Sequence, residues 1–315
     1  MTRTEAAPGE DAPVRRIAAT VVDAPPCALG ESPRWAHGAW WWVDAEAGTV
    51  WTADAGLTST GSAGEVRAVL ATGGRVSLVQ PASDGRLVVA SGLDLLVLDP
   101  QAATRVRWSR VQLPDGWLLN DGTADDAGRL WIGSVHPERR RGAGSLYVVE
   151  TDGRVREVAS GITLSNGMAW RSPSVLVHAD SLERCLWEHT TDPGSGRVLR
   201  SRRAITLPQG HGPLALPDGV ALDDAGGLWV AMYGAGQVWR LVDGRVESVV
   251  DVPTPQVTSV ALGGPDGRDL LVTTAREGLD PVAIEADPFA GRLFHARAEV
   301  GGCTVPPLRP RAVDS

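Results

Sequence analysis

A short-strand unit recurs six times along the chain. Each copy is a turn followed by four to six apolar or alternating residues rich in Val, Leu and Trp, and the copies begin at residues 37, 84, 126, 172, 224 and 266. The intervals are 47, 42, 46, 52 and 42 residues. A period in the forties with several short strands per unit is typical of a β-propeller blade, which cannot bury its own faces and must stack with neighbours around a central axis. The repeat therefore predicts an all-β, six-bladed β-propeller.

One propeller accounts for almost the whole chain. A parallel α/β sheet would need crossover helices of about ten or more residues between its strands, and the sequence shows no such periodicity. We expect one domain over residues 17–302, a disordered N-terminal tail at 1–16 and a frayed, Pro-rich C-terminal tail at 303–315. Tryptophans on the recurrent strands, such as Trp131, Trp229 and Trp239, are expected to pack between blades.

The composition excludes several kinds of chemistry. All 30 basic residues are arginine, so no Schiff-base, phosphate-loop or kinase-type lysine is available. The formal charge of −8 and the lack of long basic runs argue against nucleic acid as a partner, because binding to phosphates needs a basic surface. The partner that remains is a small molecule.

Cysteine usage and the N-terminal segment indicate a reducing compartment. Cys27, Cys185 and Cys303 are odd in number and widely spaced, which suggests neither a disulfide framework nor a thiolate zinc site. The N-terminus lacks the apolar core of a secretory signal, and no stretch approaches the roughly 18 apolar residues that span a bilayer. We expect a cytoplasmic protein with no membrane partner.

Residues at the same offset in successive blades are expected to occupy equivalent places around the axis. Counting back 11 residues from the recurrent strand of each blade reaches six polar residues: Glu31, Ser77, Asn120, Asn166, Asp218 and Ser259. The innermost strands of a propeller line its central channel, so residues at the mouth of that channel converge. The repeat therefore predicts a shared polar site.

The converging set has the chemistry of a site for a hard cation. It contains two carboxylates and two amide oxygens, which suit calcium, magnesium or manganese and also accept zinc. Glu31 and Asp218 would repel each other without a cation between them. We predict one divalent metal ion at this site, with calcium as the first candidate.

An alternative interpretation is structural. The pairs Asn166-Gly167 and Asp218-Gly219, and the triplet that begins at Asn120, are also ordinary turn signals that a repeat would place in every blade. Glu31 lies in LGESPRW, which has no such turn signature yet falls in the same register, and this favours a shared site. Both interpretations remain open at the level of sequence.

Other catalytic side chains are less prominent. His136 and His178 lie near the ends of recurrent strands, and His211 lies in a Gly-rich loop before Asp218. Histidines in such places are more often surface or loop residues than channel residues. The sequence contains no GxSxG motif, which sets aside acyl-enzyme chemistry on a serine.

These motifs resemble the gluconolactonase/regucalcin (senescence marker protein) family. The resemblance rests on LGESPRW at 29–35, NDGTADDAGRLWIGS at 120–134, SNGMAW at 165–170 and PDGVALDDAGGLWVAMYGAGQVWRL at 217–241, with TSVALGG and TTAREGL further on. It covers roughly residues 24–285 in the order and spacing of the family. It implies a six-bladed propeller that holds one divalent cation near the top of its channel and hydrolyses sugar lactones.

The resemblance also implies roles for particular residues. The metal ligands of the family match Glu31, Asn166 and Asp218, and Asn120 matches a residue that holds the substrate or a metal-bound water. Glu138 matches a glutamate on the loop after the recurrent strand of the third blade. Leu118 stands where many sugar-lactone members have a substrate-binding arginine, which indicates a less polar or differently decorated lactone.

The predicted function is therefore metal-dependent hydrolysis of a lactone to its hydroxy acid. The cation would polarise the lactone carbonyl, Asp218 would act as general base, and Asn120 would orient the ring. Two other functions remain open: a non-catalytic propeller that binds a metal or a small molecule, and a metal-dependent esterase for other esters, including organophosphate-like compounds.

Overall fold

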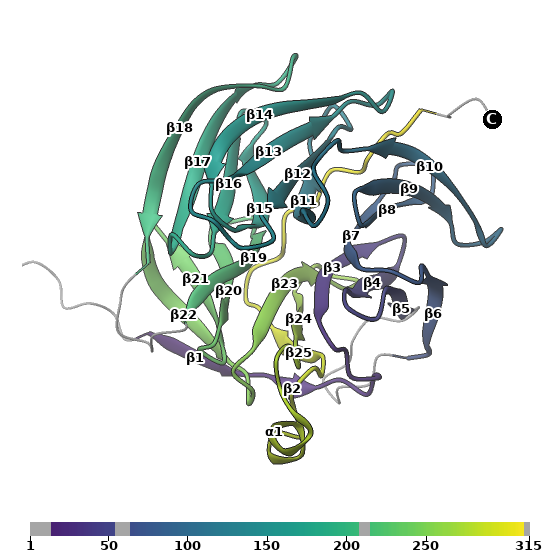
Figure 1. Cartoon of the computed structure of the whole chain (residues 1–315). Helices are drawn as coiled ribbons and strands as arrows, with labels where there is room; N and C mark the ends of the chain where they lie inside the picture. The colour runs from purple at the N-terminus through teal and green to yellow at the C-terminus, as the bar shows by residue number, and fades with distance from the viewer. Residues whose placement is uncertain (1–13, 54–63, 208–214, 312–315) are drawn as a thin grey trace, which may run out of the picture.

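The computed structural model describes residues 14–53, 64–207 and 215–311, which form six β-sheets in a ring around a central channel (Figure 1). Each sheet is one blade, and in the first four blades the strands run in sequence from the channel outwards. This arrangement confirms the predicted six-bladed β-propeller. In the described residues the one α-helix is α1 (Pro281–Ala286), and no helix there is long and apolar enough to cross a membrane.

The blades follow one another along the chain. Blade 1 contains β3 (Gly30–Ala36), β4 (Ala39–Asp44), β5 (Thr49–Ala53) and β6 (Val66–Ala71), and blade 2 contains β7 (Val76–Pro81), β8 (Leu87–Ser91), β9 (Asp94–Asp99) and β10 (Thr104–Arg110). Blade 3 contains β11 (Leu118–Ala124), β12 (Leu130–Val135), β13 (Gly144–Val149) and β14 (Val155–Ile162). Blade 4 contains β15 (Ser165–Ser172), β16 (Val175–Asp180), β17 (Cys185–Asp192) and β18 (Arg197–Thr206). Blade 5 contains β19 (Leu216–Leu222), β20 (Leu228–Tyr233), β21 (Gln237–Val242) and β22 (Arg245–Asp251), and blade 6 contains β23 (Val257–Gly263), β24 (Asp269–Thr274) and β25 (Phe294–Arg297).

The N-terminal strands close the ring. β2 (Thr20–Val21) pairs antiparallel with β25 as the fourth strand of blade 6, and β1 (Arg15–Ala18) pairs parallel with β22 of blade 5. The Arg16 guanidinium also pairs with the Asp251 carboxylate. Residues 1–13 of the predicted tail lie outside the described residues. The prediction of a disordered N-terminal tail is wrong for Arg15 and Arg16, because the edge of β22 supplies hydrogen-bond partners for their backbone.

The C-terminal segment crosses the end of the channel opposite the start of the inner strands. Residues 302–311, here called the C-terminal strap, form the last coloured trace through the ring (Figure 1). Cys303 N donates to Leu222 O at 3.0 Å, Leu308 N to Pro81 O at 3.0 Å, and Arg311 N to Thr151 O at 2.8 Å. Leu308 is completely buried. The prediction of a frayed tail from 303 is wrong for residues 303–311, because three blades bind this segment.

Tryptophans pack between blades as predicted. Trp131 lies in the apolar cluster between blades 3 and 4, Trp239 between blades 4 and 5, and Trp229 between blades 5 and 6. The indole N–H groups of Trp131 and Trp229 donate to Asp125 Oδ2 and Asp223 Oδ2, each at 2.9 Å. These two large rings are therefore buried without an unpaired N–H, which makes them suitable contacts between sheets.

The inner strands share a bulge where they begin. Pairing with the second strand of the blade shifts between Leu119 and Gly122 in β11, between Ser165 and Met168 in β15, and at the equivalent place in the other four inner strands. A bulge turns side chains away from the regular pleat. The six polar residues of the predicted register all lie at or beside these bulges.

The glycines after Asn166 and Asp218 are strand residues and not turn residues. Gly167 and Gly219 lie in β15 and β19 without positive φ. A Cβ on Gly167 would lie 2.2 Å from Val220 N of blade 5, and one on Gly219 would lie 2.0 Å from Ser259 Oγ of blade 6. The turn interpretation is therefore wrong for these pairs. Glycine is needed because neighbouring inner strands approach closely around the axis.

We expect Gly167→Ala to lower the free energy of unfolding by about 2 kcal/mol or more, because the added methyl group overlaps the backbone of blade 5. Urea unfolding followed by tryptophan fluorescence measures this change. Gly74→Ala is the matched control, since a Cβ there meets no atom within 4 Å. Equal stability of the two variants would contradict the close approach of the inner strands.

Candidate functional site

Four of the register residues line one cavity at the mouth of the channel. Glu31 of β3, Asn120 of β11, Asn166 of β15 and Asp218 of β19 surround a space of about 140 Å³, and Leu118 lies on its wall. They come from blades 1, 3, 4 and 5, so residues as far apart as 31 and 218 meet at one point. The remaining register residues, Ser77 and Ser259, are buried and are not part of this lining.

Hydrogen bonds hold the two asparagines in the cavity. Asn120 Nδ2 donates to Asn166 Oδ1 at 3.1 Å and to the carbonyl of Ser165 at 2.8 Å. Asn166 Nδ2 donates to Ser181 Oγ at 3.0 Å. These bonds occupy the amide nitrogens. The oxygen of Asn120 and the second lone pair of Asn166 Oδ1 are left for other partners.

The two acids of the cavity resist ionisation. Burial raises the pKa of Glu31 to about 8, and the nearby charge of Asp121 contributes to the increase. Asp218 is 6% exposed, and burial together with the charges of Glu31, Asp121 and Glu277 raises its pKa well above the usual range. Asp218 Oδ1 is buried and has no hydrogen-bond partner among the described residues. An unpartnered buried carboxylate oxygen is destabilising unless a further group compensates it.

These residues fit a divalent cation. A cation between Glu31 and Asp218 would remove their repulsion and give Asp218 Oδ1 a partner, and Asn166 Oδ1 would add a neutral oxygen. Within the described ranges no three His, Cys, Asp or Glu side chains are grouped to hold a metal, so the set here is two acids and one amide. Oxygen donors of this kind select a hard ion such as calcium.

A buried ion pair lies beneath the cavity. Arg34 of β3 approaches Asp121 of β11 at 3.4 Å, and its Nη2 donates to Gly122 O at 2.8 Å. Arg34 Nε donates to Gln80 Oε1 of β7 at 3.1 Å. The guanidinium therefore ties blades 1, 2 and 3 together across the axis. It also supplies the positive charge that allows Asp121 to be buried beside the site.

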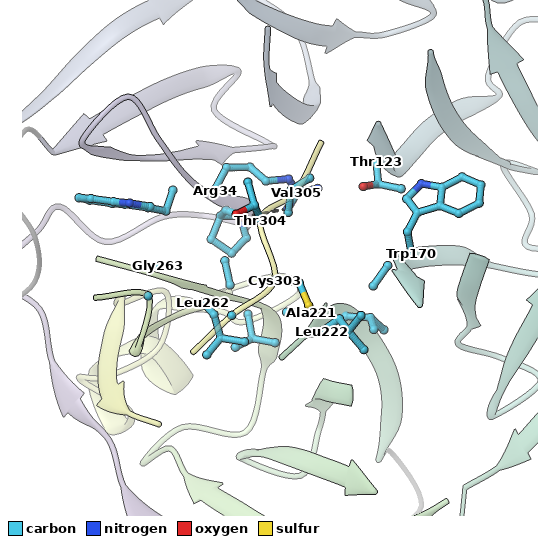
Figure 2. A pocket seen from close by; sticks show the side chains of 18 of the residues that line it. Arg34, Thr123, Trp170, Ala221, Leu222, Leu262, Gly263, Cys303, Thr304 and Val305 are labelled. Carbon is cyan, nitrogen blue, oxygen red and sulfur yellow. Dashed lines mark hydrogen bonds between the residues drawn. The ribbon is translucent and has the colours of Figure 1, made fainter. Parts of the chain in front are cut away.

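A second cavity lies at the other end of the channel (Figure 2). Its volume is about 260 Å³, and Arg34 forms part of its wall. The rest is mainly apolar, with Trp170, Leu222 and Leu262 from the blades and Cys303 from the C-terminal strap. It is larger than the cavity at the mouth, but it contains no carboxylate. Of these two cavities, the one at the mouth is therefore the candidate site.

The rim of the site includes side chains to which the sequence assigned no role. Tyr233, Glu277, Arg75 and Arg139 all line the cavity. Burial and the charges of Glu277 and Asp218 raise the pKa of Tyr233 to about 12, so its hydroxyl remains a donor at neutral pH. Glu277 lies in the segment TTAREGL and Tyr233 in GGLWVAMYGAGQVWRL, both of which carry the family resemblance. That resemblance was the signal in the sequence that could have found them. Glu277 lies in the loop after β24 and Tyr233 at the end of β20, so the register of the inner strands did not place them.

Glu138 is not brought to the site. Its side chain is 66% exposed and pairs with Arg140 at 2.7 Å, and the residues that line the cavity do not include it. The glutamate that does line the cavity, besides Glu31, is Glu277. His136 packs edge-on against Trp117, with ring centroids 5.0 Å apart. His211 lies outside the described residues.

The wall beside Asn120 is apolar. Leu118 shares it with further aliphatic side chains, which are Leu29, Val135, Leu164, Leu182 and Leu216. None of these groups can donate or accept a hydrogen bond. A bound molecule therefore meets hydrocarbon as well as polar groups in this cavity.

Comparisons with known proteins give one consistent picture. The profile described as SMP-30/Gluconolactonase/LRE-like region matches residues 29–276. A protein of Sulfolobus acidocaldarius is 30% identical over 278 residues, which cover 87% of this chain and 94% of the relative. A Pseudomonas putida protein named 6-deoxy-6-sulfogluconolactonase is 34% identical over 60% of this chain and 64% of its own length. The crystal structure of a calcium-binding protein, regucalcin, from Agrobacterium tumefaciens has a TM-score of 0.83 at 30% identity and covers 96% of this chain and all of its own.

We expect protein treated with a chelator to lose stability as the pH rises through about 8. The folded state holds a proton on Glu31 that the unfolded chain, with an ordinary pKa of 4.5, has released. The stabilisation is therefore complete below about pH 4.5 and disappears above about pH 8. Thermal unfolding from pH 6 to pH 9 measures this trend. Glu31→Gln should flatten it, and a trend of the opposite sign would contradict the assignment.

Proposed function

Because the chain belongs to the SMP-30/gluconolactonase/LRE-like family, we propose that it is a divalent-metal-dependent lactonase, which hydrolyses a cyclic ester to its hydroxy acid. One observation supports this most strongly. Asp218 Oδ1, an unpartnered buried carboxylate oxygen, lies in a cavity with Glu31, Asn166 and Asn120 that a small molecule can enter. A purely structural ion site would not need the adjoining cavity.

Glu31, Asn166 and Asp218 would hold the cation. When bound, a divalent cation supplies Lewis acidity that polarises the carbonyl of the lactone. Glu31 and Asp218 are then both ionised, since a cation offsets the repulsion that otherwise raises their pKa values. This charge state makes Asp218 a proton acceptor.

The other steps belong to side chains of the cavity. The carboxylate of Asp218 accepts a proton from water, through the oxygen that the cation does not bind, as the water oxygen attacks the lactone carbonyl carbon. The ring C–O bond breaks, and the proton passes from Asp218 to the departing alkoxide, which leaves as the hydroxyl of the hydroxy acid. Asn120 orients the substrate through its free oxygen. The Tyr233 hydroxyl remains protonated and can donate to a substrate oxygen.

The apolar wall indicates the substrate class. A sugar lactone carries several hydroxyl groups that need hydrogen-bond partners once they leave water. Leu118 and its aliphatic neighbours offer none, whereas they match an alkyl or aryl substituent. We therefore expect a less polar lactone to be preferred over gluconolactone. The same wall keeps a metal-dependent esterase for other esters as a second candidate.

We expect Asp218→Asn to lower the turnover of lactone by about 100-fold or more, because the amide cannot accept the proton of the attacking water. A pH-indicator assay at saturating calcium measures this, with metal content determined on the same sample. Glu138→Gln is the matched control, since the Glu138 side chain is exposed and does not line the cavity. A metal-loaded Asp218→Asn variant with near-native turnover would rule out the base assignment.

We expect Leu118→Arg to reverse the order of substrates. The new guanidinium can bind hydroxyl groups and shortens the apolar wall, so kcat/KM for gluconolactone should rise about 10-fold relative to an alkyl-substituted lactone. A panel of sugar, aliphatic and aromatic lactones and linear esters, with spontaneous ring opening subtracted, measures the ratio. Wild-type activity on linear esters alone would favour the esterase. Background rates on the whole panel would favour a non-catalytic binding propeller.

A further inference from the structure

Blade 4 contains a chain of side-chain hydrogen bonds that the proposed reaction does not use. Ser201 Oγ on β18 lies 2.8 Å from His189 Nδ1 on β17, and His189 Nε2 lies 3.3 Å from His178 Nδ1 on β16. His178 Nε2 lies 2.8 Å from Ser165 Oγ on β15. This hydrogen-bond chain crosses all four strands of the blade, from the exposed Ser201 to the strand that lines the channel.

A single assignment of donors and acceptors gives every group in this hydrogen-bond chain a partner. Burial lowers the pKa of His178 well below its usual range and that of His189 to about 4, so both rings are neutral at neutral pH. A neutral imidazole has one donor and one acceptor. No other acceptor for the Ser165 hydroxyl is found among the described residues, so it donates to His178 Nε2. His178 then donates to His189, and His189 donates to Ser201, whose own proton reaches solvent.

The inner end of the chain holds a residue that touches the candidate site. Ser165 is at the bulge of β15, where the regular pairing is interrupted before Met168 and the ladder alone does not fix the backbone. The Ser165 carbonyl accepts the hydrogen bond from Asn120 Nδ2. A Cβ at Gly133 would lie 1.6 Å from Ser165 Oγ, so glycine in blade 3 leaves the space that the anchored hydroxyl occupies. The serine is therefore held from both sides.

We propose that the chain Ser201–His189–His178–Ser165 is a positioning device that fixes the Ser165 carbonyl and, through it, the carboxamide of Asn120. Its effect on substrate rests on the proposed function, because Asn120 orients the substrate there. His178 and His189 are positioning residues, since neither lines the cavity. If the two histidines contributed to stability alone, their replacement would leave the carboxamide of Asn120 in place.

The side-chain amide signal of Asn120 in a ¹⁵N-labelled sample reports its position directly. Asn120→Asp identifies that signal by its loss. His178→Leu removes both ring nitrogens at similar volume, and His295→Leu is the control, because His295 is also buried and bonds to Asp269 at 2.9 Å in blade 6. We expect His178→Leu to shift the Asn120 signal and to raise KM for the lactone about 10-fold, with kcat changed less than about 3-fold. His295→Leu should change neither.

An unchanged Asn120 signal together with an unchanged KM in folded His178→Leu would overturn the proposal. If that variant does not fold, Ser165→Ala decides, because it removes only the anchored hydroxyl and should shift the same signal. If the wild-type protein hydrolyses no lactone or ester, the proposed function fails. The Asn120 signal then still decides whether the chain positions that residue, since it does not depend on activity.

Discussion

Close approach of the six inner strands around the axis is the constraint on which the rest of the molecule depends. Gly167 and Gly219 leave room for the backbone or side chain of the next blade, and a bulge at the start of each strand turns the adjacent side chain toward the channel. The same geometry that allows the ring to close therefore delivers Glu31, Asn120, Asn166 and Asp218 to one cavity. Fold and site have a common cause.

This convergence concentrates charge that the protein only partly compensates. The guanidinium of Arg34 partly compensates Asp121 beneath the cavity, whereas Glu31 and Asp218 have no buried cationic partner of that kind among the described residues. Perturbed acids of this sort are typical of functional sites, where stability is given up for reactivity. Family membership, shown by the profile match over residues 29–276, agrees with this interpretation.

The repeat was sufficient to predict the six blades and the four register residues that share the cavity, because equal offsets in a ring become equal positions in space. The repeat did not decide whether the Asn-Gly and Asp-Gly pairs lie in turns or in strands. Glycine is used both where φ is positive and where two backbones approach closely. Glu277 and Arg75 lie outside the inner strands, where the register argument does not reach. The C-terminal strap carries no strand pattern, and its order comes from backbone partners on three blades that only the folded ring provides.

The two ends of the chain also determine how the molecule can assemble. Blade 6 takes β2 from the N-terminal end and β25 from the C-terminal end, and Thr20 Oγ1 bonds to the carbonyl of His295, 275 residues away. An open solenoid can grow one repeat at a time, because each repeat contacts only its neighbours. This ring cannot be completed until nearly all of the chain has been synthesised, and contacts of such long sequence separation slow folding. Until then β1 and β2 have no partner strand, and the apolar face of blade 1 that packs against blade 6 is uncovered, which makes the interval before closure the period of greatest exposure to aggregation.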